Sequence, residues 1–540
     1  MKVVVLGGVA AGTKTAAKLM RENQENEVII LNKGSDISYA GCGLPYYVGH
    51  VIEEEAQLIV NSPAMFEKLT KVQVKTNTEA VKVDPDQKIV FAKDLTTGKE
   101  QEYDYDKLVI ATGARPLTSE LPGIELPRIF YMRTPQDAVD LRKLIDEGNC
   151  KKAVVVGAGY IGLEIAENLK ANGIRPFVLD MMPHVLPGFD ADMADLIERK
   201  LMEQQIPVVT GVKVTGFEAD GEGLKVLTSK RAYKADFVVM SAGIRPNTEF
   251  LQDTGIEMFK GTILTDATGV TNLADIYAAG DCAMVHNAIT GKPAWSPMGS
   301  TANIFGRDVA LNMSGKERKH AGVLGTAVCK LPGINVGRTG LTEEQAKAEG
   351  FDAVSVVTAE DDKAHYMPGA AGFITKMIAD RKSMRLLGIQ VIGQGNVDKM
   401  VDVAVTGISL KGTLDQLADM DLSYAPPFST AIHPFAHTLN VLMNKIDGTM
   451  KSVTPGEYLD GKVEEYRVID TCKVPSIEGA AYVNLTDVTG VIPGVGVDEK
   501  LLLVCNRGRK AYLLQNRMKA AGYKDTLVLE GGIAVNDVEI

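Results

Sequence analysis

The sequence predicts an α/β fold in which two Rossmann-like nucleotide-binding domains precede an α+β domain and a smaller C-terminal α/β domain. Three observations support this prediction: two glycine-rich turns that each follow a short apolar strand, a change to alternating apolar residues near residue 326, and a further strand–loop–helix pattern near residue 505. A chain of 540 residues needs several domains, because a single hydrophobic core stops growing at roughly 250–300 residues.

The composition excludes several classes of protein. A formal net charge of −11 argues against nucleic acid as a partner, because phosphate binding needs a concentrated basic face. No apolar run reaches the roughly 18 residues of a membrane span, and the first strand follows Met1 too closely for a signal peptide. We therefore expect a cytoplasmic protein with no membrane partner. Six cysteines without a close Cys-x-x-Cys pair predict neither a disulfide framework nor a metal site.

The first nucleotide-binding domain begins at the N-terminus. An apolar strand over 3–6 runs into Gly-Gly-Val-Ala-Ala-Gly at 7–12, and a helix is expected over 13–22. Glycines at such a turn let the backbone and the helix N-terminus approach a pyrophosphate. The next strand, 27–31, ends in asparagine rather than in the acid that usually receives ribose hydroxyls. The predicted contacts of this turn are Gly7, Gly8, Ala11, Gly12, Asn32 and Lys33.

A second copy of this pattern follows a strand over 153–156. Its glycines are Gly157, Gly159 and Gly162, its helix is expected to continue to 171, and the next strand ends on Asp180. An acid at this distance accepts a hydrogen bond from a free ribose 2′-hydroxyl and repels a 2′-phosphate. The second site is therefore predicted to prefer NADH to NADPH.

Two further strands run into turns of small residues, at 108–116 and 275–281. The second turn ends in an acid that can bond the ribityl chain of a flavin. The remaining predicted cofactor-binding residues are Ala111, Thr112, Gly113, Gly243, Gly280 and Asp281.

A lone cysteine lies in Ser38-Tyr39-Ala40-Gly41-Cys42-Gly43-Leu44-Pro45, shortly after the second strand. A thiol between glycines at this place is typical of a thiol presented to a flavin. The order of glycine turn, cysteine loop, Ala-Thr-Gly, second glycine turn and Ala-Gly-Asp resembles the pyridine nucleotide-disulfide oxidoreductases over about residues 1–445. That resemblance implies FAD at the first turn, NADH at the second, and a redox role for Cys42.

The branch of this family is indicated by what surrounds the cysteine. Disulfide reductases with two redox cysteines carry them five apart, but Tyr47 stands five residues after Cys42. The single cysteine resembles coenzyme A disulfide reductases, NADH oxidases and NADH peroxidases. Ala10 stands where peroxidase-like members have a histidine, which weakens the peroxidase hypothesis, and Gly-Gly-Val-Ala-Ala-Gly is usual in the coenzyme A branch.

The segment after about residue 326 is predicted to be an antiparallel sheet with helices packed against it. It resembles the dimerisation domain of the family, which implies a homodimer. The segments 365–369 and 422–428 resemble those that bring tyrosines to the cysteine of the other subunit. This implies catalytic roles for Tyr366 and Tyr424, as hydrogen-bond donors or general acids to a leaving sulfur.

The C-terminal segment repeats a strand–loop–helix pattern around Cys505-Asn506-Arg507-Gly508-Arg509-Lys510. It resembles the Cys-x-x-Gly-x-Arg loop of a rhodanese domain, in which a nest of backbone N–H groups lowers the pKa of a sulfur-carrying thiol. Lys510 replaces the usual arginine, and 476–480 lacks the usual histidine and proline. A docking or packing module is the alternative, and we expect Cys472 to be a core or surface thiol.

The predicted domains follow from these motifs. They are an FAD-binding domain at 1–115 and 241–325, an NAD(H)-binding domain at 116–240, a dimerisation domain at 326–445, a linker at 446–460 and a rhodanese-like domain at 461–540.

The resemblance implies an FAD-dependent NADH oxidoreductase that reduces coenzyme A disulfide, coenzyme A persulfide or polysulfide through Cys42, while Cys505 handles sulfane sulfur. Coenzyme A is anionic, so its pocket needs polar or cationic groups, for which the candidates are Lys18, Arg21, Ser38 and Lys71. Two alternatives stay open. One is an NADH oxidase in which Cys42 cycles through a sulfenate, and the other is a sulfur-carrier or redox-sensing flavoprotein with little turnover.

Overall fold

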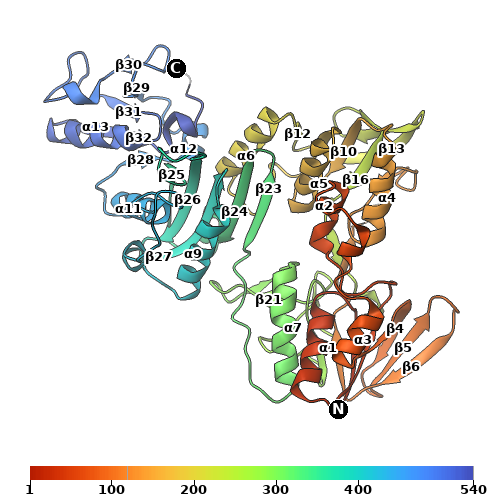
Figure 1. The fold of residues 1–540 in the computed structure, drawn as a ribbon. Coiled ribbons are helices and arrows are strands. Elements are labelled where there is room, and N and C mark those ends of the chain that lie inside the picture. The colour runs from red at the N-terminus through yellow and green to blue at the C-terminus, as the bar shows by residue number, and fades with distance from the viewer. Residues whose placement is uncertain (118–119, 539–540) are drawn as a thin grey trace. The chain divides into compact units, whose positions relative to one another are not determined.

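The computed structural model describes residues 1–117 and 120–538 (Figure 1). The chain forms two compact units, Met1–Pro183 with Gln205–Val323 and His184–Gln204 with Leu324–Ile540. Every helix in the described ranges is too short or too polar to cross a membrane.

The first unit begins with a five-stranded parallel sheet in the order β20-β7-β1-β2-β3. The strands are β1 (Lys2–Leu6), β2 (Glu27–Leu31), β3 (Gln73–Lys75), β7 (Lys107–Ile110) and β20 (Ile276–Ala278). Helices α1 (Ala11–Glu22) and α7 (Gly299–Met313) cover one face, and their approach is so close that a Cβ on Gly306 would lie 2.7 Å from Ala11 O. The antiparallel strands β4 (Thr78–Asp84), β5 (Ile89–Asp94) and β6 (Glu100–Asp104) pack on the other face.

A second parallel sheet in the same unit has the order β12-β11-β10-β16-β9. Its strands are β9 (Ile129–Phe130), β10 (Lys152–Val156), β11 (Arg175–Leu179), β12 (Val208–Val209) and β16 (Phe237–Met240). The helices α4 (Pro135–Asp146) and α5 (Tyr160–Ala171) belong to this sheet, and the meander β13 (Val214–Asp220), β14 (Gly223–Thr228) and β15 (Tyr233–Ala235) packs on it. The strands that precede the two glycine turns, β1 and β10, lie where the glycine-turn patterns predicted them.

The second unit contains a five-stranded antiparallel sheet in the order β23-β24-β27-β26-β25, as the alternation after residue 326 predicted. The strands are β23 (Ala327–Leu331), β24 (Ile334–Gly340), β25 (Ala353–Asp361), β26 (Gly372–Asp380) and β27 (Arg385–Gly393). Helices α9 (Val397–Ser409) and α11 (Pro434–Ile446) pack on the sheet. Helix α8 (Glu343–Ala348) lies in the connection from β24 to β25, and α10 (Leu414–Ala418) lies between α9 and α11.

Helix α6 (Ala191–Glu203) lies, by sequence, inside the predicted NAD(H) domain at 116–240, yet it packs in the second unit. The buried Lys376 of β26 binds Asp192 Oδ2 at 2.9 Å, and it also pairs with Asp190 and Glu343. These three carboxylates raise the pKa of Lys376, although burial opposes them. A buried ion cluster, invisible in the local pattern, therefore attaches the segment 184–204 to the antiparallel sheet.

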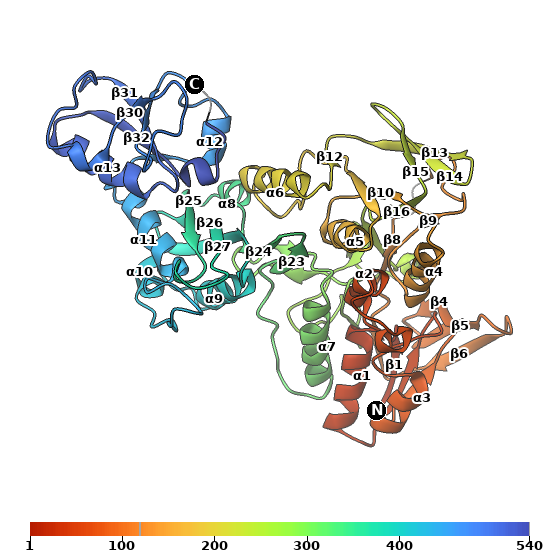
Figure 2. The same ribbon diagram turned by 45° about the horizontal axis from the view of Figure 1, so that its top comes forward.

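The C-terminal part of this unit is a parallel sheet in the order β28-β32-β31-β29-β30 (Figure 2). Its strands are β28 (Ser452–Val453), β29 (Arg467–Asp470), β30 (Ala481–Tyr482), β31 (Lys500–Val504) and β32 (Asp525–Leu529), and helix α13 (Arg509–Ala520) packs against it. The predicted linker at 446–460 differs from expectation, because it contains β28 and α12 (Pro455–Leu459). An edge strand of two residues is too short to be recognised from the sequence.

Candidate functional site

The first glycine turn packs tightly against the end of β7. Gly7 has a φ of +104°, and a Cβ there would lie 2.1 Å from Ala111 O. A Cβ on Gly12 would lie 1.9 Å from Gly7 O. Only glycine permits this backbone, which leaves the end of β1 and the N-terminus of α1 open to a phosphate group.

Asn32 closes this turn from the side. Its Oδ1 accepts from Gly8 N at 3.0 Å, and its amide donates to two carbonyl groups of the following loop at 2.9 and 3.0 Å. The side chain is therefore used to fix the turn. Lys33 is exposed and forms an ion pair with Glu79 at 2.8 Å.

The predicted small-residue turns converge on the same place. A Cβ on Gly280 would lie 3.1 Å from Ala11 Cβ, and one on Gly113 would lie 3.1 Å from Arg133 Nη2. Arg133 pairs with Asp281 at 3.2 Å. The structure thus brings Gly7, Ala11, Gly113, Gly280 and Asp281 into one cradle, which Arg133 joins although no sequence motif marked that residue.

Thr112 connects that cradle to Asn247, the residue that follows β17 (Ile244–Pro246). Its hydroxyl donates to Asn247 O at 2.7 Å, while Asn247 Nδ2 donates to Thr112 O at 2.9 Å. These reciprocal bonds fix the turn that carries Ala111 and Gly113.

The second glycine turn has the same design. Gly157 has a φ of +113°, and a Cβ there would lie 2.3 Å from Ser241 O. A Cβ on Gly162 would lie 1.9 Å from Gly157 O, whereas one on Gly159 would meet nothing within 4 Å. The turn therefore leaves open space over Gly159, at the N-terminus of α5.

Asp180 lies at the end of β11 beside this turn. Its Oδ2 accepts from Ala158 N at 2.5 Å and its Oδ1 from Met182 N at 2.7 Å. Gly243 has a φ of +114°, with nothing within 4 Å of the position of a Cβ. The residues predicted to bind NADH thus surround one open turn, and Gly243, predicted only as a cofactor-binding residue, follows the Ser241–Ala242 segment that packs against Gly157.

The cysteine loop connects the two turns. Ser38 N donates to Gly8 O at 2.8 Å, which joins the loop to the first turn. Cys42 lies in the short 3₁₀ turn Gly41–Gly43, and α2 (Leu44–Val48) follows it. A Cβ on Gly49 would lie 1.9 Å from Asn168 Oδ1, so α2 packs closely on α5, the helix of the second turn.

The surroundings of Cys42 favour its protonated form. Although the residue is exposed, burial of its sulfur by neighbouring protein atoms raises the thiol pKa, Glu164 and Asp281 raise it further, and Arg133 lowers it. Burial also raises the pKa of Glu164 to about 7, and the Tyr46 hydroxyl donates to Glu164 Oε1 at 3.4 Å. Sequence reasoning missed Glu164, although its place two residues after the third glycine of the second turn was a usable signal.

Replacing Glu164 by glutamine is expected to lower the pKa of Cys42, because it removes a carboxylate that opposes the thiolate. Glu164 is ionised in the wild type above pH 7. At such a pH, and with both proteins free of flavin, iodoacetamide should alkylate Cys42 about two- to fivefold faster in Glu164→Gln than in the wild type. Glu218→Gln, which changes an exposed acid of the same unit that acts on neither Cys42 nor Glu164, is the matched control and should leave the rate unchanged. An equal or slower rate in Glu164→Gln would contradict this electrostatic assignment.

The two predicted tyrosines come together in the second unit. Tyr366 and Tyr424 are 64% and 51% exposed. Desolvation raises the pKa of Tyr424, and a hydrogen bond between the two hydroxyls adds to this effect. They are therefore a pair of exposed phenols within one chain.

The predicted substrate cations are less well supported by the geometry. Lys18 forms an ion pair with Glu22, whose pKa is held at about 2 by Lys18 and by Lys316. Arg21 is in the last turn of α1, and Lys71 is the left-handed residue that ends α3 (Pro63–Thr70). Among the described residues, none of these three predicted cations forms a hydrogen bond or ion pair with the cysteine loop, whereas Ser38 is part of it.

Cys505 lies after β31 and before α13, as predicted, but it is buried, with only 2% of its surface exposed. Gly508 has a φ of +87° at the N-cap of α13. Arg507 pairs with Asp361 at 2.8 Å, and Arg509 Nε donates to Glu360 at 3.2 Å, both at the end of β25. The loop is therefore fixed to the antiparallel sheet, and its sulfur is not presented at the surface.

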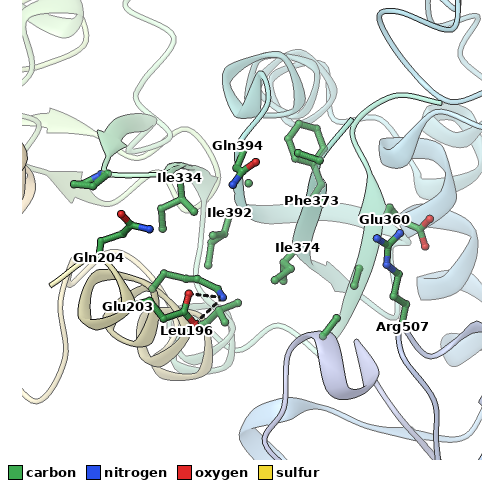
Figure 3. Close-up of a pocket in the computed structure, with 18 residues that line it drawn as sticks. Leu196, Glu203, Gln204, Ile334, Glu360, Phe373, Ile374, Ile392, Gln394 and Arg507 are labelled. Carbon is green, nitrogen blue, oxygen red and sulfur yellow. Dashed lines mark hydrogen bonds and ion pairs between the residues drawn. The ribbon is translucent and has the colours of Figure 1, made fainter. Parts of the chain in front are cut away.

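A pocket of about 310 Å³ lies beside this loop (Figure 3). Apolar side chains from β24, β26 and β27 form part of its wall, including Ile334, Ile374 and Ile392. Its cations Lys200 and Arg507 are both paired with carboxylates. The pocket therefore offers no free cation of the described chain to an anionic ligand, and we do not assign coenzyme A to it.

Comparison with known proteins adds to this geometry. The model of the pyridine nucleotide-disulphide oxidoreductase family matches residues 1–299, and the model of the dimerisation domain of that family matches 326–436. An NADH oxidase of Methanocaldococcus jannaschii is 32% identical over 83% of this chain and 99% of its own length. A CoA-dependent NAD(P)H sulfur oxidoreductase of Pyrococcus furiosus is 33% identical over 82% of this chain and 99% of its own length. The structure of an NAD-dependent persulfide reductase from A. fulgidus is 34% identical, covers 99% of this chain and 100% of its own, and superimposes with a TM-score of 0.93.

Proposed function

Because the chain belongs to the pyridine nucleotide-disulphide oxidoreductase family, and is thus a flavoprotein reductase that uses FAD and NAD(P)H, we propose that it reduces coenzyme A disulfide, coenzyme A persulfide or polysulfide with NADH. The observation that carries this proposal is the placement of Cys42. Its loop is bonded to the first glycine turn and its helix packs on that of the second. A single thiol between two dinucleotide sites is suited to receive electrons and pass them to sulfur.

The residues present fit both nucleotides. The turn that contains Gly7 and Gly12, together with Gly280 and Asp281, would hold FAD, and the turn that contains Gly157 with Asp180 would hold NADH. When bound, these groups supply hydride transfer and deliver two electrons to the sulfur of Cys42. The glycines let backbone N–H groups approach the phosphates, and Asp180 favours a free ribose 2′-hydroxyl.

The thiolate of Cys42 attacks a disulfide and breaks its S–S bond, so that one thiol leaves and a mixed disulfide remains on Cys42. With a persulfide, attack on the carbon-bound sulfur expels hydrosulfide and leaves the same mixed disulfide. Two-electron reduction of that mixed disulfide releases the bound thiol and restores Cys42. The leaving sulfur needs a proton. We assign this role to the Tyr366–Tyr424 pair of a second subunit, supported by the mutual contact of the two exposed phenols and by the matched dimerisation domain. The active assembly is then a homodimer.

The domains are assigned as predicted, with an FAD-binding domain at 1–115 and 241–325 and an NAD(H)-binding domain at 116–240. The segment 184–204 is the exception, because it packs in the second unit. The dimerisation domain spans 326–445 and the rhodanese-like domain 461–540. The segment between them contributes β28 and α12, and β28 is the edge strand of the C-terminal sheet. Six free cysteines fit a reducing, cytoplasmic compartment.

The C-terminal domain is proposed to handle sulfane sulfur at Cys505. Support comes from its parallel sheet, from the left-handed Gly508 at the N-terminus of α13, and from the similarity over the full length of the persulfide reductase. Because Cys505 is buried, sulfur transfer requires the loop 505–510 to open, and the ion pairs of Arg507 and Arg509 hold it closed.

Anaerobic stopped-flow spectroscopy of the holoenzyme tests the proposed substrate class. After one equivalent of NADH has reduced the flavin, coenzyme A persulfide or disulfide is expected to reoxidise it at least about a hundredfold faster than dissolved oxygen does. Fast reoxidation by oxygen with no response to sulfur substrates would instead support the NADH oxidase alternative, which the named relative from M. jannaschii favours.

The nucleotide preference has its own test. Removing the acid and adding a cation in Asp180→Ala/Met181→Arg is expected to shift the kcat/KM ratio of NADPH to NADH by about a hundredfold toward NADPH. Met181→Arg alone, with Asp180 retained, serves as the matched control and should shift the ratio much less. No shift in the double variant would contradict a ribose contact for Asp180.

A further inference from the structure

Two buried cysteines meet at one end of the C-terminal sheet. Cys472 and Cys505 follow β29 and β31, neighbouring parallel strands whose register pairs Asp470 with Val504. Thr471 N donates to Val504 O at 2.8 Å, so the pairing continues one residue past the strands. Cys505 therefore lies one residue beyond its strand and Cys472 two residues beyond the neighbouring one.

The two sulfur atoms share one environment. Both side chains belong to the hydrophobic cluster formed with α13, where Cys472 is 4% and Cys505 2% exposed. Burial raises the pKa of the Cys472 thiol to about 11, and Asp470 and Cys505 are among the groups that raise it further. Neighbouring strands lie about 4.8 Å apart, and the register places Thr471 opposite Cys505, so Cys472 is the next residue after the one opposite Cys505.

Hydrogen bonds hold both cysteines in these positions. The carboxylate of Asp470 accepts from Cys472 N at 2.8 Å and from Ser476 N at 2.7 Å. Cys505 O accepts from Ile533 N at 3.1 Å, and a Cβ on Gly532 would lie 1.9 Å from that oxygen. These contacts therefore fix the backbone of both cysteines at the end of the sheet.

A third group points to chemistry at this place. The hydroxyl of Thr471 is buried and has no hydrogen-bond partner among the described residues. Such groups are uncommon in folded proteins and call for an explanation. Thr471 precedes Cys472 and is opposite Cys505 in the register of the two strands, since Thr471 N donates to Val504 O.

We propose, resting on the sulfur-carrying role proposed above for Cys505, that Cys472 is its resolving thiol. When Cys505 carries an outer sulfur, the sulfur of Cys472 attacks Cys505 Sγ, and the bond from Sγ to the outer sulfur breaks. Hydrosulfide leaves with the proton of Cys472 as hydrogen sulfide, and a Cys472–Cys505 disulfide remains. The persulfide sulfur is reduced and the two thiols are oxidised, so this step needs no other oxidant.

The disulfide is opened by a small thiol of the coenzyme A type. Two thiol molecules restore both cysteines and leave as one small-molecule disulfide, so that atoms and electrons balance. That product is the substrate class proposed for Cys42. The carrier domain would thus feed the flavin site with a diffusible disulfide.

The test uses the full-length holoenzyme without NADH. The protein is treated anaerobically with sodium polysulfide, desalted rapidly, alkylated and digested for mass spectrometry. We expect a linked Cys472–Cys505 peptide in the wild type. In Cys472→Ser we expect no linked peptide, an outer sulfur retained on Cys505, and sulfide release after desalting lowered by more than about tenfold.

Control variants separate the chemistry from folding. Cys329→Ser, which changes another buried cysteine of the same unit, should behave as wild type. Both Cys472→Ser and Cys472→Ala should still bind FAD and bleach with NADH. A stable outer sulfur on Cys505 of the wild type without a linked peptide would overturn the resolving role and leave the carrier role intact. Finding neither a linked peptide in the wild type nor an outer sulfur on Cys505 in either protein would overturn both.

Discussion

Cys42→Ser is expected to lower kcat for coenzyme A disulfide and persulfide by about a thousandfold or more, because serine cannot form a mixed disulfide. NADH should still bleach the bound flavin in a single turnover, since the glycine turns that hold both nucleotides are unchanged. Steady-state turnover and stopped-flow reduction, measured on the same preparation, separate the two effects.

Cys150→Ser is the matched control for this substitution, because Cys150 is a buried cysteine of the same unit. It should keep kcat within about twofold of the wild type. If Cys42→Ser retained sulfur turnover within tenfold of wild type, Cys42 would not be the redox thiol. Such a result would favour a flavoprotein whose reduced flavin acts on substrate directly.

Gly7→Ala is expected to reduce the FAD bound per chain about tenfold or more. The new Cβ would lie 2.1 Å from Ala111 O, on a backbone with a φ of +104° that alanine avoids. The turn must then move away from the end of β7, and the phosphates lose their backbone donors. Flavin absorbance after denaturation, divided by protein concentration, measures the effect.

Gly34→Ala is a fair comparison, because it lies in the loop after β2, lacks a positive φ, and its nearest heavy atom would be 3.6 Å from the new Cβ. It should retain FAD at the wild-type ratio. Full FAD occupancy in Gly7→Ala would show that the first turn does not bind the flavin phosphates.

Much of the fold was predictable, because the glycine turns, the buried strands and the alternation after residue 326 are local patterns. Strand β2 coincides with the predicted range 27–31, and β10 begins one residue before the predicted range 153–156. The packing of α6 was not predictable in this way. It depends on Lys376 meeting Asp190 and Asp192, residues that are far apart in the chain and carry no sign of being buried together.

The functional site was likewise predictable where it depends on local motifs and not where it depends on long-range packing. Gly7, Gly157 and Cys42 were predicted from motifs, and the structure brings them into one unit. Arg133 was missed because a lone arginine looks like a surface residue in the sequence. Glu164 was missed although it follows the third glycine of the second turn by two residues, because its burial depends on the tertiary contact between α5 and α2. The pairing of Cys472 with Cys505 was missed for a related reason, since parallel neighbours in a sheet are separated by long crossovers.

The buried Glu530 joins the C-terminal sheet to the antiparallel sheet of the same unit. It follows β32 and accepts from Val357 N at 2.8 Å, from Lys445 Nζ at 2.6 Å and from Ser452 Oγ at 2.6 Å. One carboxylate thus supplies an acceptor for a backbone amide of β25 and a counter-charge for a lysine of α11. Removing the C-terminal sheet would leave that lysine without this carboxylate and expose the amide, so the antiparallel sheet depends on the C-terminal sheet for part of its own hydrogen bonding.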